Sequence, residues 1–273
     1  MTSPLVPAGE LRDLLAGTSP PLLLDVRWTL AGPDPAAHGA GHLPGAVFVD
    51  LDADLAAPPG AGGRHPLPDA DAFTSTMQRL GVGPGREVVV YDGGSGAAAR
   101  AWWSLRYFGH ASVRVLDGGL AAWVSVGGDL ETGPVAARPA PGAVAVPGGM
   151  PLLDAEGAAR VASSGGLLDA RTAERFRGEN EPVDPVAGRV PGARSLPVTA
   201  LLRPDGTARA SADVRALLGE VAGSPSEVGA YCGSGVTAAQ TVLALASAGI
   251  DAGLYAGSWS DWITDPSRPV ARN

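Results

Sequence analysis

The chain has 273 residues, a formal net charge of −8, and 45% hydrophobic against 18% charged residues. This composition indicates a folded globular protein and excludes a disordered chain. All 20 basic residues are arginine, which excludes Schiff-base and pyridoxal chemistry and a P-loop lysine, and the acidic balance argues against a nucleic-acid partner.

Short apolar runs alternate with helical patterns along the first half of the chain. Runs at 22–26, 88–92 and 113–117 are rich in Val and Leu and end at or near Asp, which is typical of buried parallel strands. The helical patterns at 69–81 and 97–109 end at Gly, as a helix C-terminus does. The alternation predicts an α/β domain whose ligands bind at the carboxyl ends of the strands.

The second half repeats the first. The paired segments share motifs in the same order, and they are 22–28 with 167–172, 41–55 with 188–202, and 87–123 with 227–262. Offsets between matching residues stay between 139 and 147, which is hard to reconcile with chance similarity of Ala-, Gly- and Leu-rich segments. We therefore predict tandem domains at 1–135 and 150–273, joined by a Pro- and Gly-rich linker at 136–149.

Cys232 is the only cysteine, so an internal disulfide and a multi-cysteine metal site are impossible. The four histidines lack the spacing of a metal-binding helix motif, and we expect neither metal nor cofactor. No basic segment followed by an apolar run marks a leader, and no stretch is long and apolar enough to cross a membrane. We expect a cytoplasmic protein, in which a lone thiol stays reduced.

The segment around Cys232 favours anion chemistry. It follows an apolar run at 228–231 and precedes a helical pattern at 237–249. A thiolate or persulfide there would face the helix N-terminus and the backbone N–H groups of the loop. The glycines allow a tight loop. The residues that would supply these N–H groups are Gly233, Gly235, Val236 and Thr237. The alternatives are a buried structural cysteine and a cysteine phosphatase, but the phosphatase loop needs Arg where Ala238 stands.

The loop CGSGVTA at 232–238 resembles that of the rhodanese family of sulfurtransferases, in its 3-mercaptopyruvate version. LLDAR, ERF, PGA and the closing GSWSDW also match, as do LDVRW, GHLPGA and LDGGLAAW in the first half. The resemblance implies two rhodanese-like domains, each a parallel sheet flanked by helices. It also implies that the first copy is inactive, since Asp92 stands at the position of the cysteine.

The resemblance implies a double displacement through a Cys232 persulfide at the floor of a cleft between the domains. The donor would be 3-mercaptopyruvate, and the acceptor a thiol, thioredoxin or cyanide. Thiosulfate is the alternative donor. A non-enzymatic persulfide carrier is the alternative function.

The resemblance also assigns roles to two arginines. Arg175 matches the family arginine that binds the anionic donor, although a solvated surface arginine is the alternative. Arg189 stands where many rhodanese domains have His, so it is a second substrate-binding candidate. The mercaptopyruvate enzymes carry a further arginine in the loop after ERF, and here residues 178–188 contain none.

The mercaptopyruvate branch further suggests a Ser–His–Asp relay that moves a proton onto the leaving enolate. Ser234 matches the serine, His42 of GHLPGA matches the histidine, and Asp34 is the nearest upstream acid. A structural role for His42, in the turn before Pro44, is the alternative.

Overall fold

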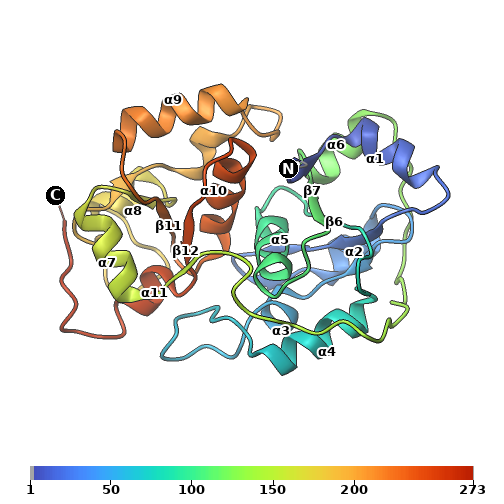
Figure 1. Ribbon diagram of the computed structural model, residues 1–273, viewed down its shortest axis with the longest axis horizontal. Coiled ribbons are helices and arrows are strands. Elements are labelled where there is room, and N and C mark those ends of the chain that lie inside the picture. The colour runs from blue at the N-terminus through green and yellow to red at the C-terminus, as the bar shows by residue number, and fades with distance from the viewer. Residues whose placement is uncertain (1–2, 273) are drawn as a thin grey trace. The chain divides into compact units, whose positions relative to one another are not determined.

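The chain forms two compact units (Figure 1), and this computed structural model describes residues 3–272. Unit 1 comprises Met1–Ala57, Leu67–Met150 and Pro204–Thr207. Unit 2 comprises Pro58–Pro66, Pro151–Arg203 and Ala208–Asn273. The segment Pro58–Pro66 thus belongs to the unit that holds Cys232, although it lies within residues 1–135, which we predict as the first domain.

Unit 1 is built on a five-stranded parallel sheet with the strand order β1-β7-β6-β2-β5. Its strands are β1 (Leu5–Val6), β2 (Leu22–Asp25), β5 (Val47–Phe48), β6 (Val88–Tyr91) and β7 (Val113–Leu116), with a separate antiparallel pair β3 (Trp28–Thr29) and β4 (Gly32–Pro33). Its helices are α1 (Ala8–Leu15), α2 (Pro35–Ala40), α3 (Leu51–Asp54), α4 (Ala70–Leu80), α5 (Ala97–Tyr107) and α6 (Gly119–Ser125).

Unit 2 has the order β10-β9-β11-β12-β8, again with every pairing parallel. Its strands are β8 (Leu152–Leu153), β9 (Leu167–Asp169), β10 (Arg194–Ser195), β11 (Gly229–Tyr231) and β12 (Gly253–Tyr255). Its helices are α7 (Ala155–Ser163), α8 (Ala173–Arg177), α9 (Ser211–Ala222), α10 (Val236–Ser247), α11 (Ser258–Trp262) and a 3-10 turn at Val198–Leu201. Read from its other end, this order matches that of unit 1, which confirms the repeat and the α/β class.

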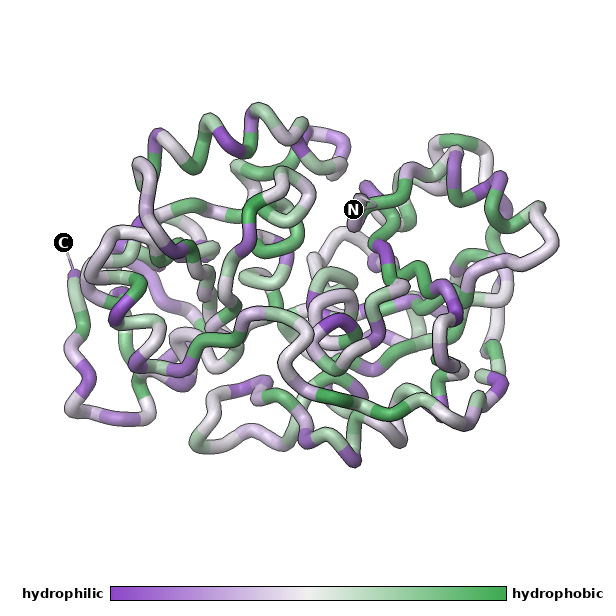
Figure 2. Tube along the Cα trace, viewed as in Figure 1, coloured by the Kyte–Doolittle hydropathy of each residue, from purple (hydrophilic) through white to green (hydrophobic). Residues whose placement is uncertain are grey.

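The strands form where the apolar runs predict them. β2 and β6 are buried along their whole length, as strands of a parallel sheet covered on both faces are, and the green stretches of Figure 2 trace such segments. Asp69 caps the N-terminus of α4, where its side chain accepts a hydrogen bond from Ala72 N at 2.8 Å, and Gly81 caps the C-terminus with φ +85°. Local capping chemistry therefore sets this helix at both ends.

Both units hold a buried Tyr–Asp pair at the ends of neighbouring central strands. In unit 1, Tyr91 Oη donates to Asp25 Oδ2 at 2.9 Å and accepts from Leu43 N at 3.0 Å. In unit 2, Tyr231 pairs in register with Asp169, and its hydroxyl accepts from Val190 N at 3.2 Å. In each unit the tyrosine hydroxyl thus binds the loop that contains Leu43 or Val190 to the sheet. The strands before Asp92 and Cys232, β6 and β11, therefore make the same contact in both units.

The expected linker packs along unit 1. Ala140 N donates to Gln78 O at 2.9 Å, Ala145 N to Thr74 Oγ1 at 2.9 Å, and Gly149 N to Tyr107 O at 2.9 Å. Its Pro- and Gly-rich composition rules out a regular element, yet these bonds hold it to the helices α4 and α5.

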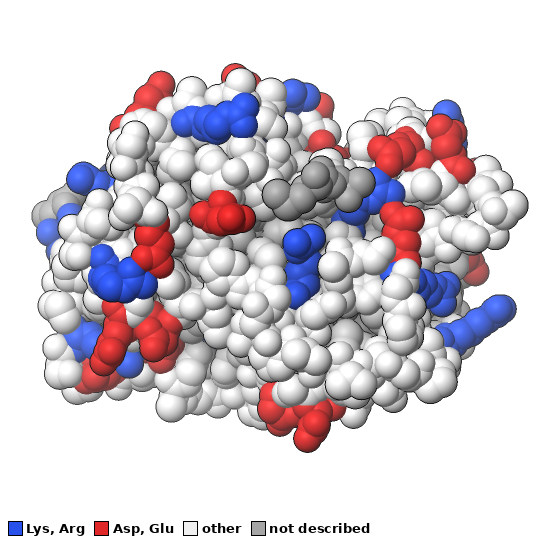
Figure 3. All heavy atoms as spheres, in the orientation of Figure 1, with Lys and Arg blue, Asp and Glu red and all other residues white. Residues whose placement is uncertain are grey.

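Acidic and basic side chains are interspersed on the face drawn in Figure 3, without a single basic stripe. Within residues 3–272, no helix is both long and apolar enough to cross a membrane.

Candidate active site

The cysteine loop joins β11 to α10 in unit 2. Gly235, with φ +81°, is the residue at which the chain turns into the helix, a conformation that suits glycine. The helix α11 holds the loop from the other side, because Trp259 N donates to Cys232 O at 3.0 Å and Ser260 N to Gly233 O at 2.9 Å. Two backbone bonds from α11 therefore hold the first two residues of the loop.

The Cys232 sulfur is buried against this backbone. Gly235 N donates to Sγ at 3.1 Å, and Cys232 N donates to Ser258 Oγ at 3.1 Å. Ser258 is the one non-glycine residue of residues 3–272 with a positive φ, at +54°. The first N–H groups of α10, which begins at Val236, have no acceptor within the helix and can serve as further donors to an anion. An anion on sulfur is what this loop can stabilise.

A histidine contacts the serine of the loop. His65 Nδ1 lies 2.8 Å from Ser234 Oγ, and Ser234 is buried. His65 comes from the segment Pro58–Pro66, which packs on unit 2. A neutral imidazole can accept or donate a proton through this hydroxyl, so the pair can serve as a proton relay beside Cys232.

Arg175 lies beside the loop on α8. Its Nε and Nη2 donate to Glu181 at 3.0 and 2.7 Å, and Nη2 also donates to Asp184 at 3.2 Å. Although burial alone would raise the pKa of Glu181, the Arg175 hydrogen bonds hold that pKa below its ordinary value. A Cβ built on Gly233 would lie 3.4 and 3.7 Å from Nη2 and Nη1 of Arg175. The structure thus brings Arg175 to the cysteine loop.

Arg171 has a structural setting. It is buried, donates to Asp169 and Glu181, and its guanidinium lies 5.0 Å from the Trp259 ring centroid. Burial disfavours its charge, yet the Asp169 carboxylate raises the pKa of Arg171. These contacts give Arg171 a structural role, as the partner of the Asp169 and Glu181 carboxylates.

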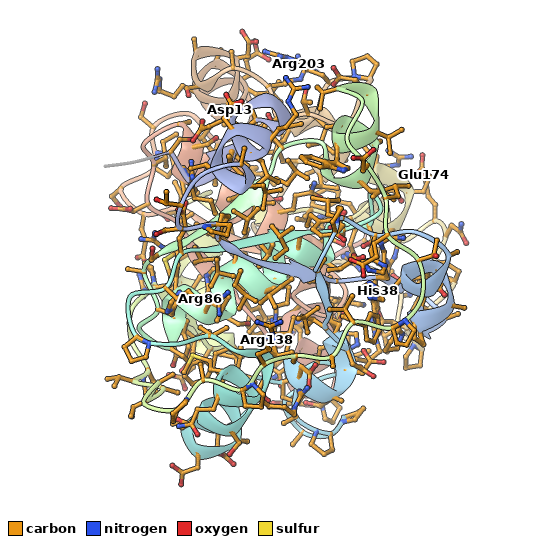
Figure 4. The ribbon with its side chains drawn as sticks, turned by 90° about the vertical axis from the view of Figure 1, so that its right-hand side faces the viewer. Asp13, His38, Arg86, Arg138, Glu174 and Arg203 are labelled. Carbon is orange, nitrogen blue, oxygen red and sulfur yellow. The ribbon has the colours of Figure 1, made fainter. Side chains whose placement is uncertain are left out.

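His42 and Asp34 lie in unit 1, and their contacts there are structural. His42 Nδ1 lies 2.9 Å from His38 O, the two rings stack with centroids 4.1 Å apart, and His38, which is labelled in Figure 4, also contacts Asp25. Asp34 caps α2 by accepting from Ala37 N at 2.9 Å. These contacts do not support a relay of Ser234 with His42 and Asp34. The histidine in contact with Ser234 is His65.

Arg189 faces another part of unit 2. Its guanidinium lies 4.5 Å from the Phe176 ring centroid, and Nη1 donates to Phe176 O at 3.3 Å. It lines a surface pocket of about 560 Å³ together with Ser163, Ser164 and Arg194. These contacts give no support to a role in donor binding.

Sequence reasoning missed Arg64 and His65, although the repeat carried a signal. The interval from Pro44 to Asp92 is seven residues longer than that from Pro191 to Cys232. The extra residues of the first copy fall in the region of Pro58–Pro66, which the structure packs beside Cys232. Within the described residues, no cluster of three or more His, Cys, Asp or Glu side chains could hold a metal ion.

Comparison with known proteins agrees with this architecture. The model of the rhodanese-like domain matches residues 7–126 and 153–265. The Mycobacterium tuberculosis protein SseB, named as a thiosulfate sulfurtransferase, is 48% identical, and the match covers 98% of this chain and 96% of SseB. A Pseudomonas aeruginosa protein named as a 3-mercaptopyruvate sulfurtransferase is 45% identical, with 95% and 96% covered. The human 3-mercaptopyruvate sulfurtransferase is 36% identical, with 93% and 89% covered.

Among solved structures, YnjE matches with a TM-score of 0.82 at 26% identity, over 98% of this chain and 68% of YnjE. The anaerobic ergothioneine biosynthesis enzyme of Chlorobium limicola has a TM-score of 0.85 at 20% identity, over 98% of this chain and 70% of that enzyme, which is a likeness of fold. With both domains matched and full-length relatives of this similarity, the chain belongs to the rhodanese family, as a two-domain member of the sulfurtransferase class.

Proposed function

We propose that this protein transfers sulfur from 3-mercaptopyruvate to a thiol or to cyanide through a persulfide on Cys232. The observation that carries the proposal is the Cys232 sulfur held by Gly235 N at 3.1 Å, in a loop whose Ser234 contacts His65 at 2.8 Å. The loop supplies a nucleophile and an anion site, and the Ser234–His65 pair supplies the proton that an enolate leaving group needs.

In the first step, the Cys232 thiolate attacks the thiol sulfur of the donor. A sulfur–sulfur bond forms, the carbon–sulfur bond breaks, and its electron pair stays on carbon as the enolate of pyruvate. Ser234, in contact with His65, delivers a proton and pyruvate leaves. Arg175 binds the donor carboxylate, since a guanidinium fork matches a planar carboxylate.

In the second step, an acceptor thiolate or cyanide attacks the outer sulfur of the persulfide. The sulfur–sulfur bond breaks and its electron pair returns to Cys232 as the thiolate. The backbone N–H groups of Gly233, Gly235, Val236 and Thr237 surround the outer sulfur and stabilise its negative charge. A protein thiol such as thioredoxin fits this chemistry, and a reducing compartment such as the cytoplasm would keep Cys232 active.

Thiosulfate is the second candidate donor. The absence of an arginine from residues 178–188 and the similarity to SseB favour it. Its leaving group is sulfite, which needs no carbon protonation, so the Ser234–His65 pair would be idle in that reaction.

The test is kcat/KM with 3-mercaptopyruvate and with thiosulfate in one preparation, with cyanide as acceptor. A preference of about 100-fold for 3-mercaptopyruvate supports the proposal. A preference for thiosulfate assigns the second donor, and negligible turnover with both, beside a detectable persulfide, indicates a carrier.

A further inference from the structure

Arg64 lies against the cysteine loop in unit 2. A Cβ built on Gly233 would stand 2.7 Å from Arg64 Nη2, closer than real Cβ contacts allow. A side chain at 233 would therefore displace this guanidinium, whereas glycine lets it lie next to Cys232.

The Arg64 guanidinium is held in a fixed orientation. Its Nη1 pairs with Asp184, whose other oxygen accepts from Arg175 Nη2 at 3.2 Å. Asp184 is buried, whereas the Arg64 side chain is 33% exposed and the Arg175 side chain 17%. One buried carboxylate therefore binds two arginines, and both remain accessible to a small ligand.

Both guanidinium groups, while bonded to these carboxylates, also lie close to Gly233 of the cysteine loop. Arg175 donates from Nε and Nη2 to Glu181 and Asp184, and its Nη2 and Nη1 lie 3.4 and 3.7 Å from the Cβ position at Gly233. Arg64 uses Nη1 on Asp184 and turns Nη2 to the same position. Nη1 of Arg175 and Nη2 of Arg64 thus converge on the backbone next to Cys232.

The backbone of Arg64 is fixed as well. Arg64 N donates to Ser260 Oγ at 3.0 Å, and the preceding Gly63 has φ +93°. A Cβ on Gly63 would lie 2.7 Å from both Gly257 O and Ser260 Oγ, so this segment packs tightly on α11. Arg64 is therefore placed by the fold and is not a freely moving surface side chain.

We propose that Arg64 is a substrate-binding residue that contacts the anionic group of the sulfur donor together with Arg175. It takes the role of the arginine that residues 178–188 lack, and it comes from the first half of the chain. The proposal rests on the proposed function, because it names the group that holds the donor. Two guanidinium groups can each donate to one oxygen of a carboxylate, which fixes its orientation above the sulfur.

The first test is steady-state kinetics of Arg64→Gln with 3-mercaptopyruvate. Loss of a charge-assisted hydrogen bond should lower kcat/KM by about 10- to 100-fold, mainly through KM. Arg64→Lys, which keeps the charge but not the fork, should recover part of the loss. Arg177→Gln is the matched control, since Arg177 is 37% exposed and its bonds go to Glu179, and it should leave kcat/KM unchanged.

The second test needs no turnover. Iodoacetate and iodoacetamide both alkylate a thiolate with loss of iodide, and they differ in carrying a carboxylate or a neutral amide. The rate constant for iodoacetate divided by that for iodoacetamide, both measured at Cys232, should fall about 10-fold in Arg64→Gln. The neutral reagent reports thiol reactivity in the same variant, so a general disturbance of the loop changes both rates and leaves their ratio alone.

The outcomes separate the two proposals. If the wild-type protein forms no persulfide with either donor, the proposed function fails, while the alkylation ratio still tests Arg64. If the wild-type protein turns over and Arg64→Gln matches it in both KM and alkylation ratio, the role of Arg64 is overturned and the proposed function stands.

Discussion

The loop at Asp92 and the loop at Cys232 occupy the same place in two copies of one fold. Each follows a strand that ends in a buried tyrosine and enters a helix through a left-handed glycine, Gly96 with φ +79° or Gly235 with φ +81°. In each, the first residue's carbonyl accepts a bond of 3.0 Å from a later helix, from Leu120 N or Trp259 N. The backbone scaffold is thus the same around both loops.

The loops differ in what occupies their N–H groups. The Asp92 carboxylate accepts from Gly94 N at 2.6 Å and Ala98 N at 2.9 Å, so the first copy fills its anion site with its own side chain. Cys232 Sγ accepts a hydrogen bond from Gly235 N alone among the described donors. A strand, a glycine turn and a helix make an anion site in both copies. The first residue of the loop, Asp92 or Cys232, decides whether an external anion can occupy that site.

The largest expected effect distinguishes Cys232 from Asp92, the first residues of the two loops. Cys232→Ser should lower kcat by at least about 10³-fold, because no other thiol can carry the sulfur. Asp92→Ser, the matched change in the other loop, should retain turnover close to wild type. Steady-state assays of both variants with both donors check this, and turnover surviving in Cys232→Ser would contradict the assignment of the site.

Moving the thiol sharpens the comparison. Asp92→Cys in the Cys232→Ser background should remain below about 1% of wild-type turnover, since Arg64, His65 and Arg175 pack around the other loop. The same assay checks it. Recovery of activity would mean that the glycine loop and helix suffice and that the surrounding residues of unit 2 are dispensable.

The relay should have the next effect. His65→Ala and Ser234→Ala should each lower kcat for 3-mercaptopyruvate by about 100-fold and affect thiosulfate little, because only the first reaction protonates an enolate. His42→Ala is the comparison variant from unit 1, and it should cost thermal stability without this donor selectivity. Equal losses with both donors in His65→Ala would contradict the relay.

A smaller effect should come from the backbone of the Pro58–Pro66 segment. Gly63→Ala should lower kcat/KM by about 10-fold, since its Cβ meets Gly257 O and Ser260 Oγ at 2.7 Å and displaces Arg64 and His65. Gly60→Ala meets nothing within 4 Å and serves as the control. Kinetics of the pair tests this, and equal activity would show that the segment tolerates movement.

The smallest effect concerns pH. Burial raises the pKa of Asp92, despite the opposing hydrogen bonds from Ala98 and Gly94. The folded state therefore binds more protons than the unfolded chain above about pH 4, and the contribution of Asp92 to stability falls as pH rises. An asparagine at position 92 does not titrate, so the Asp92→Asn variant lacks this pH-dependent loss. The difference in Tm, variant minus wild type, should therefore become more positive from pH 4 towards neutrality. A difference that is flat or falls with pH would contradict the shift.

Much of the fold was predictable because its signals are local. The fully apolar runs of β2 and β6 and the terminal glycine of the α4 segment predict the elements, and the repeat predicts their common order. Cys232 and Arg175 could be chosen because each stands in a recognisable motif next to a strand end or helix. These features depend on neighbours in sequence.

The residues around Cys232 were harder to predict because tertiary contacts place them. His65 reaches Ser234, 169 residues away in sequence, only because Gly63 and Arg64 pack on α11. The GHLPGA motif drew attention to His42, whose ring is instead buried against His38. Spacing and motif carry no information on such docking, and only the seven-residue excess of the first copy pointed to it.

The most direct measurement is the intact mass of the wild-type protein after incubation with 3-mercaptopyruvate in the absence of an acceptor, followed by peptide mapping. The account predicts a gain of one sulfur atom, located on Cys232, that disappears when a thiol or cyanide is added. A protein that turns over the donor without ever carrying the added sulfur on Cys232 would contradict it.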